Sequence, residues 1–83
     1  MKHLIELIAS VINISPTVLN LQSGPGNISN WDSLAHVGVA AAVEQTYQVQ
    51  LEMSEILSIK TIADIRNLLE KRGVTFVNEE HAA

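Results

Sequence analysis

The chain contains no cysteine among its 83 residues. A disulfide, a thiolate zinc site and a cysteine nucleophile are therefore excluded, and apolar packing must hold the fold together. Cationic side chains are also few, since five Lys and Arg stand against nine Asp and Glu, for a formal net charge of −4. Nucleic-acid binding needs clustered cations, so we expect no nucleic-acid partner. The lack of cysteine suits a reducing cytoplasm, where we expect the protein to lie.

Long apolar runs are absent as well. No segment approaches the roughly 20 apolar residues of a membrane-spanning helix, so we expect no membrane segment. The opening stretch MKHLIELIASVINIS is interrupted by Glu6 and fits a helix with one apolar face better than a signal peptide. The chain is too short for two cores, and we predict one small monomeric domain without the walls of a deep enzyme cleft.

The first predicted helix rests on apolar residues at the i, i+3, i+4, i+7 spacing, namely Leu4, Leu7, Ile8 and Val11. It should end near Ser15, because Pro16 disfavours helical backbone in the residue before it. Turn-forming residues follow, with Gly24-Pro25-Gly26 as the strongest break, and predict a long loop. We expect the loop to be ordered and pinned to the core by three apolar side chains, Leu19, Leu21 and Ile28.

The remaining helices are predicted from their caps and apolar stripes. Asp32 can accept first-turn amides at the start of a second helix, Ser33 to about Tyr47. A short third helix is expected over Ile56 to Ile59. Thr61 and Asp64 have capping-box spacing for a fourth helix that stops at Gly73.

The predicted fold is therefore all-α, a four-helix bundle with three longer helices, a short third helix and a long loop between helices one and two. We place the helical domain at residues 1–73. The tail, residues 74–83, has no sustained pattern and is expected to be partly disordered.

The second helix carries two separate apolar lines. One line is expected to be buried and consists of Val39, Val43 and Tyr47, with Ala42 beside them. The other begins beside Ser33 and consists of Leu34, Val37 and Ala41. Either both lines belong to the core, or one of them contacts another protein. Gly38, inside the helix, could permit the close approach of a neighbour.

His36 lies one helical turn after Ser33 and could be imagined as a general base. The sequence offers neither a third group to orient it nor a glycine-rich elbow of the hydrolase kind. We therefore interpret His36 as a solvent-exposed histidine on the helix surface. His3 and His81 do not have the spacing of a metal site. No catalytic residue and no metal ligand is assigned.

Two segments resemble acyl carrier proteins. The stretch WDSLAHVGVAAAVEQTY resembles their Asp-Ser-Leu motif and second helix, and ILSIKTIADIRNLLEKRG resembles their third and fourth helices. The resemblance spans nearly the whole chain in family order. It implies that Ser33, between Asp32 and Leu34 of the motif, is the attachment point for 4'-phosphopantetheine, transferred from coenzyme A by a magnesium-dependent phosphopantetheinyl transferase.

By the same resemblance, acyl groups would be carried on that arm as thioesters between acyl-loading and acyl-accepting enzymes, and the chain itself would be non-catalytic. The expected partner-facing residues are Leu34, Val37 and Ala41 in the second helix. Ile59 and Ile62, near the junction of the third and fourth helices, are expected to line a pocket or contact partners.

The second helix departs from the pattern of fatty-acid-type carriers, which present acidic residues there. Ala35 and Gly38 occupy positions where acids are common, and Glu44 is followed by Gln45 and Thr46. Since complementary charge selects partners, we expect a carrier for a specialised pathway of polyketide-like, lipid-modifying or aminoacyl-transfer chemistry.

Three alternatives stay open. An aminoacyl or peptidyl carrier would use the same serine and arm. An unmodified helical interaction module would share the shape but leave Ser33 inert. A small serine-dependent hydrolase is the weakest of the three, for the reasons given for His36.

Overall fold

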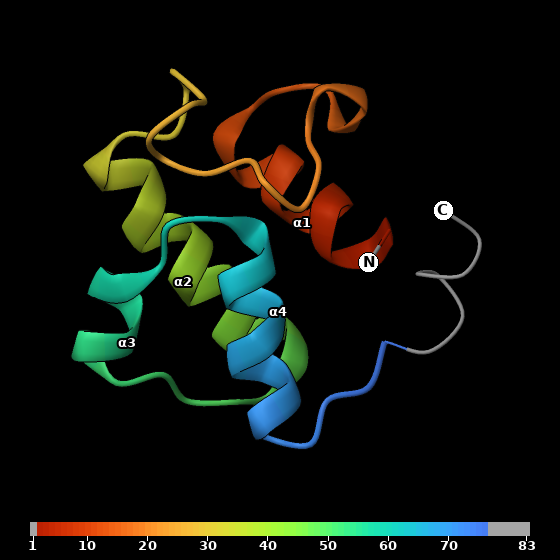
Figure 1. The fold of residues 1–83 in the computed structure, drawn as a ribbon, viewed down its shortest axis with the longest axis vertical. Coiled ribbons are helices and arrows are strands. Elements are labelled where there is room, and N and C mark those ends of the chain that lie inside the picture. The colour runs from red at the N-terminus through yellow and green to blue at the C-terminus, as the bar shows by residue number, and fades with distance from the viewer. Residues whose placement is uncertain (1, 77–83) are drawn as a thin grey trace.

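The computed structural model describes residues 2–76, which form four α-helices and one short 3-10 turn. The elements are α1 (Lys2–Ile12), η1 (Pro16–Val18), α2 (Ser33–Tyr47), α3 (Met53–Ser58) and α4 (Ile62–Lys71). No strand occurs within this described part. Figure 1 shows the long loop crossing from α1 to the start of α2, with α3 at the edge opposite α1. The predicted all-α four-helix architecture is confirmed.

The core lies between the helices and takes side chains from all three longer ones. Trp31, which ends the long loop, is the largest fully buried side chain. The other side chains with less than 2% exposure are Leu4, Ile8, Val39, Val43, Ile62, Ile65 and Leu69. Val39 and Val43 are buried as their spacing predicts, and Ala40 is buried beside them.

Helix α1 ends three residues earlier than predicted. The cause is Asn13, whose φ of 59° places it in the left-handed region that stops a helix. Asparagine adopts that region more readily than most residues. The amide of Ile14 then bonds back to the carbonyl of Ala9 at 3.0 Å, which satisfies one of the last carbonyls of the helix.

The loop between η1 and α2 is pinned to the fold, as predicted. Leu19 is buried, while Leu21 and Ile28 are half-buried against the core. Two backbone bonds join the loop to the start of α4, from Ile62 N to the Ser23 carbonyl at 2.8 Å and from Ala63 N to the Leu21 carbonyl at 3.0 Å. The middle of the loop is thereby held against the start of α4.

Helices α2 and α4 begin and end close to the predicted residues, and both predicted caps are present. Asp32 caps α2, and Thr61 and Asp64 form the capping box of α4. Gly73, with a φ of 90°, stands just past the end of α4 and needs the conformational freedom of glycine.

Helix α3 begins at Met53, before the predicted Ile56. The earlier start comes from a capping box between Glu52 and Glu55, in which the Glu55 carboxylate accepts the amide of Glu52 at 2.9 Å. Glutamate in place of serine or threonine at the cap hides this signal in the sequence.

Gly38 permits a close approach of α1 to α2, since a Cβ at this position would lie 3.3 Å from Cγ1 of Val11 in α1.

The core also extends past the expected domain end at residue 73, because Phe76 is buried and packs edge-on against Tyr47 with ring centroids 5.8 Å apart. The rest of the predicted tail, residues 77–83, lies outside the described residues. Within residues 2–76, the length and hydropathy needed to cross a bilayer are found in none of the helices.

Candidate functional site

The start of α2 is built around Ser33, the first residue of the helix. On one side of it, the Asp32 carboxylate accepts the amide of Ala35 at 2.8 Å. The Asp32 carbonyl accepts the amide of His36 at 2.8 Å, which is the first bond of the helix. The backbone on both sides of Ser33 is therefore fixed by Asp32.

Ser33 itself is exposed, so its hydroxyl is open to a partner enzyme. The first amides of an α-helix have no acceptor within the helix, and the helix dipole adds partial positive charge there. A phosphodiester on the Ser33 oxygen would stand at this end of α2, where both effects favour an anion. The residues present therefore fit a phosphate-linked group at Ser33.

A groove of about 600 Å³ lies between α2 and α3, beside Ser33. Its walls are mostly apolar. From α2 and the loop before it come Pro25, Trp31, Asp32, Ser33, His36, Val37, Ala40, Ala41 and Glu44, and from α3 and its end come Met53, Ile56, Leu57 and Ile59. The serine predicted to be modified thus opens onto an apolar groove.

The apolar side chains flanking the groove are exposed. Leu34 and Val37 of α2 are 82% and 63% exposed, and Met53 and Leu57 of α3 are 66% and 73% exposed. Ala41 is exposed as well. The second apolar line of α2 is therefore surface. Of the first line, Val39 and Val43 are core, whereas Tyr47 and the neighbouring Ala42 are half-buried. The sequence-based analysis did not single out Met53, because the start of α3 was placed after it, or Leu57, which lies inside the predicted third helix.

Ile59 and Ile62 do not form part of this surface. Ile59 is 5% exposed and contributes to the groove wall, whereas Ile62 is fully buried. A contact between Ile62 and a partner is excluded in this structure, because its side chain points into the core between α4 and the other helices. The expectation of a docking role is therefore wrong for Ile62.

Negative charge is scarce on α2. Its sequence from Ser33 to Tyr47 holds one acid, Glu44, and no lysine or arginine. The Glu44 carboxylate accepts the amide of Leu51 at 2.8 Å and so is used to hold the segment between α2 and α3. The exposed face of α2 beside Ser33 is apolar rather than acidic.

His36 is not the solvent-exposed histidine expected from the sequence. The indole Nε1–H of Trp31 donates to Nδ1 of His36 at 3.0 Å, and Nε2 of His36 lies 2.8 Å from the carbonyl oxygen of Ile56 in α3. Both ring nitrogens are therefore engaged, and neither is left to take a proton from Ser33. The hydrolase alternative loses its candidate base.

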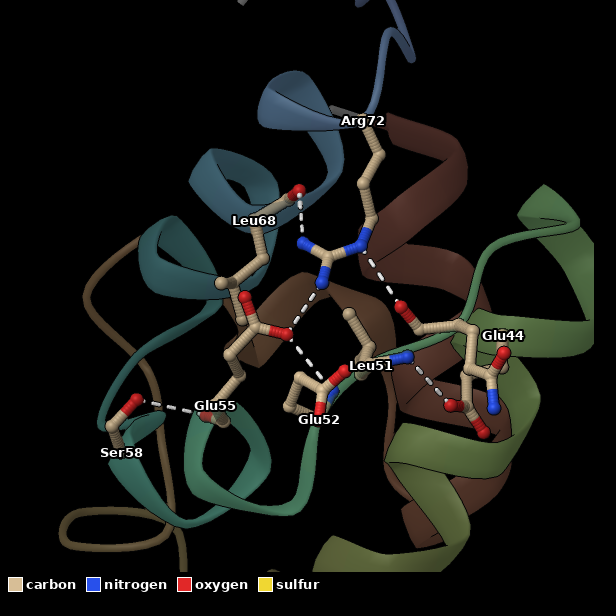
Figure 2. A network of polar contacts seen from close by, with 8 residues as sticks. Glu44, Leu51, Glu52, Glu55, Ser58, Leu68 and Arg72 are labelled. Atoms are coloured by element: carbon tan, nitrogen blue, oxygen red, sulfur yellow. Dashed lines mark hydrogen bonds and ion pairs between the residues drawn. The ribbon is translucent and has the colours of Figure 1, made fainter.

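Arg72, at the end of α4, contacts the first turn of α3. Figure 2 shows the guanidinium between three acceptors, namely the Glu55 carboxylate, the carbonyl of Gln50 at 2.9 Å and the carbonyl of Leu68 at 3.3 Å. The amide of Glu52 and, next in effect, the side chain of Arg72 hold the pKa of Glu55 below its ordinary value. The bond to Glu55 joins α3 to the end of α4, and the bond to Gln50 joins the segment before α3 to the same place.

Metal-binding groups are not found: residues 2–76 bring together no three His, Cys, Asp or Glu side chains in a way that could hold a metal ion.

The family described as "Phosphopantetheine attachment site" matches residues 2–69. Among solved structures, the chain is similar to the solution structure of a holo acyl carrier protein from Geobacter metallireducens, with a TM-score of 0.74 and 25% sequence identity. The match covers 83% of this chain and 79% of that one. No curated protein matches the chain.

Proposed function

Since the chain belongs to the acyl carrier protein family, whose members are non-catalytic carriers with a covalently attached 4'-phosphopantetheine, we propose that Ser33 holds this group. The observation that carries the proposal is the placement of an exposed serine at the first position of α2, between the Asp32 cap and the apolar groove. When attached, the group supplies a flexible arm ending in a thiol, on which acyl groups are held as thioesters.

The chain's own residues have three tasks in this function. The Ser33 hydroxyl forms the phosphoester. Asp32 fixes the turn that presents Ser33 by accepting the amide of Ala35, and the positive end of the α2 dipole favours the phosphate. The exposed apolar residues Leu34, Val37 and Ala41 offer contact area to the phosphopantetheinyl transferase and to the acyl-loading and acyl-accepting enzymes.

The proposal is tested by the intact mass of the unmodified protein after incubation with coenzyme A, magnesium and a broad-specificity phosphopantetheinyl transferase. A gain of one phosphopantetheine is expected. A folded sample that gains no mass, beside a control carrier that does, would favour an unmodified interaction module.

We also propose that the carrier serves a specialised pathway rather than general fatty-acid synthesis. The support is the apolar face of α2, whose one acid is used to bind the Leu51 amide. Enzymes that recognise carriers through complementary charge would find little to bind here, since charge pairing steers encounter and rejects wrong partners.

Loading of the modified protein by acyltransferases of a fatty-acid synthase tests the pathway proposal. We expect slow loading, with a gain in rate for the Ala35→Glu variant, which restores an acid shortly after the motif. Efficient loading of the parent protein would contradict the proposal. Loading by an aminoacyl-activating enzyme instead would identify the aminoacyl carrier.

A further inference from the structure

Helix α3 has little packing of its own. It contains six residues, and none of them is buried. Its apolar side chains Met53 and Leu57 are 66% and 73% exposed, and the buried residues nearest to it, Leu51 and Ile59, lie just outside its ends. A helix of this length is not stable alone in water, so contacts with the rest of the chain must hold it.

Ile56 packs against the core, and two polar links add to this contact. At the start of α3, Glu55 pairs with Arg72 of the α4 end. In the last turn of α3, the Ile56 carbonyl accepts the amide of Ile59 at 3.3 Å and faces Nε2 of His36, in α2, at 2.8 Å. The two links join α3 to different helices, and the one from His36 is the link that reaches the Ser33 end of α2.

The partners of His36 determine where its proton lies. The indole nitrogen of Trp31 can only donate, so Nδ1 must be the acceptor of that bond. The Ile56 carbonyl can only accept, so Nε2 must carry the proton. The neutral Nε2–H tautomer satisfies both bonds at once. Because Trp31 is 1% exposed, the ring is fixed from the core side.

His36 therefore connects the residues around Ser33 with α3. Trp31 stands two residues before Ser33 and His36 three residues after it, and both line the groove together with Ile56. The width of the groove depends on where α3 lies relative to α2, and the bond to Ile56 sets that distance at the Ser33 end.

We propose that His36 is a positioning residue, which keeps α3 in place against α2 and so maintains the shape of the groove and apolar surface that partner enzymes meet beside Ser33. The effect of His36 on the position of α3 does not depend on modification of Ser33. The consequence for partner enzymes rests on the proposed function of Ser33.

Two substitutions separate the two bonds of the ring. In His36→Gln the amide reaches the place of Nε2 and can still donate to the Ile56 carbonyl. In His36→Asn the amide lies near the place of Nδ1 and can accept from Trp31, but it is too short to reach α3. The readout is amide hydrogen exchange of Ile56 and Ile59 in the unmodified protein, with Ile8 and Ile65 as core references.

We expect exchange at Ile56 and Ile59 to become about three- to tenfold faster in His36→Asn and to stay within about twofold of the parent in His36→Gln, as loss of one hydrogen bond implies. The core references should not change. Equal acceleration in both variants, acceleration of the core references to the same extent, or no acceleration in His36→Asn would each overturn the proposal.

A measurement on the parent protein keeps the proposal testable if a variant fails to fold. Nitrogen chemical shifts of the His36 ring should show a protonated Nε2 and an unprotonated Nδ1. The opposite tautomer would overturn the proposal, because neither of the two bonds could then form as described.

The consequence for partners is read from steady-state modification by the transferase. We expect KM for the carrier to rise about three- to tenfold in His36→Asn with kcat unchanged, and His36→Gln to behave like the parent. An unchanged KM in His36→Asn overturns the link to partner recognition. If the parent is not modified at all, the proposed function fails, while the exchange experiment still decides the role of His36.

Discussion

The carboxylate of Asp32 accepts the amide of Ala35 at 2.8 Å, and this bond closes a short loop around Ser33. Asp32 adopts extended backbone, with φ −88° and ψ −172°, as a helix cap requires. The bond links stability to presentation of the serine, because the residue that caps α2 stands directly before Ser33.

Removal of this cap should destabilise the unmodified protein. We expect Asp32→Ala to lower the free energy of unfolding by about 0.5–2 kcal/mol, and Asp32→Asn to retain most of it, since asparagine also caps helices well. Urea denaturation measures both. An Asp32→Ala variant as stable as the parent would show that the cap contributes nothing.

Replacement by alanine should change stability differently at two glycines of the long loop. At Gly24 a Cβ would lie 1.8 Å from the carbonyl oxygen of Lys60, which is backbone and cannot rotate away. At Gly26 a Cβ would meet nothing within 4 Å. We expect Gly24→Ala to cost about 1–3 kcal/mol of stability and Gly26→Ala to be neutral or slightly stabilising.

Thermal or urea unfolding of the two glycine variants gives the comparison directly. Similar stabilities for both would contradict the close contact between the loop and the start of α4.

The Glu55–Arg72 pair should make the free energy of unfolding depend on pH. The pKa of Glu55 is held below its ordinary value by the Glu52 amide and by Arg72. Because the pKa of Glu55 is lower in the folded than in the unfolded state, its charged carboxylate stabilises the fold at pH values above the unfolded-state pKa. This stabilisation is lost as the pH falls through the folded-state pKa. The parent should therefore lose more stability than Glu55→Gln between about pH 6 and about pH 3.

Urea unfolding of the parent and of Glu55→Gln at several pH values measures this difference. Parallel curves for the two proteins would mean that the pair does not contribute to acid sensitivity.

The exposed apolar surface beside Ser33 should matter for partners and little for folding. Leu34 is 82% exposed, so Leu34→Ala should leave the unfolding free energy within about 0.5 kcal/mol of the parent. It should lower kcat/KM for modification by about threefold or more, if the transferase buries this side chain. Val18→Ala, at a 53% exposed position on η1, is the matched control. Equal effects of the two substitutions would argue against a docking role for Leu34.

Local signals predicted most of the fold. Helix α2 was placed from Asp32 and α4 from Thr61 and Asp64, because a cap acts within three residues and its spacing is visible in the sequence. Helix α3 was started too late, because its cap is a glutamate. Helix α1 was extended too far, because the proline break at Pro16 was visible and the left-handed backbone at Asn13 was not.

The environment of His36 could not be predicted from local pattern. Its partners lie five and twenty residues away, and the second is a backbone carbonyl, which every residue possesses. The exposure of Ile62 was misjudged for a similar reason, since a residue beside a helix junction faces the core or solvent according to how the helices pack. Tertiary structure decides both.

The central claim, attachment at Ser33, is tested most directly by comparing three proteins after incubation with coenzyme A, magnesium and a phosphopantetheinyl transferase. The parent and Ser29→Ala, which removes an exposed serine of the loop before α2, should each gain one phosphopantetheine by intact mass. Folded Ser33→Ala should gain none. A phosphopantetheine on Ser33→Ala, or its loss in Ser29→Ala, would contradict the assignment of Ser33.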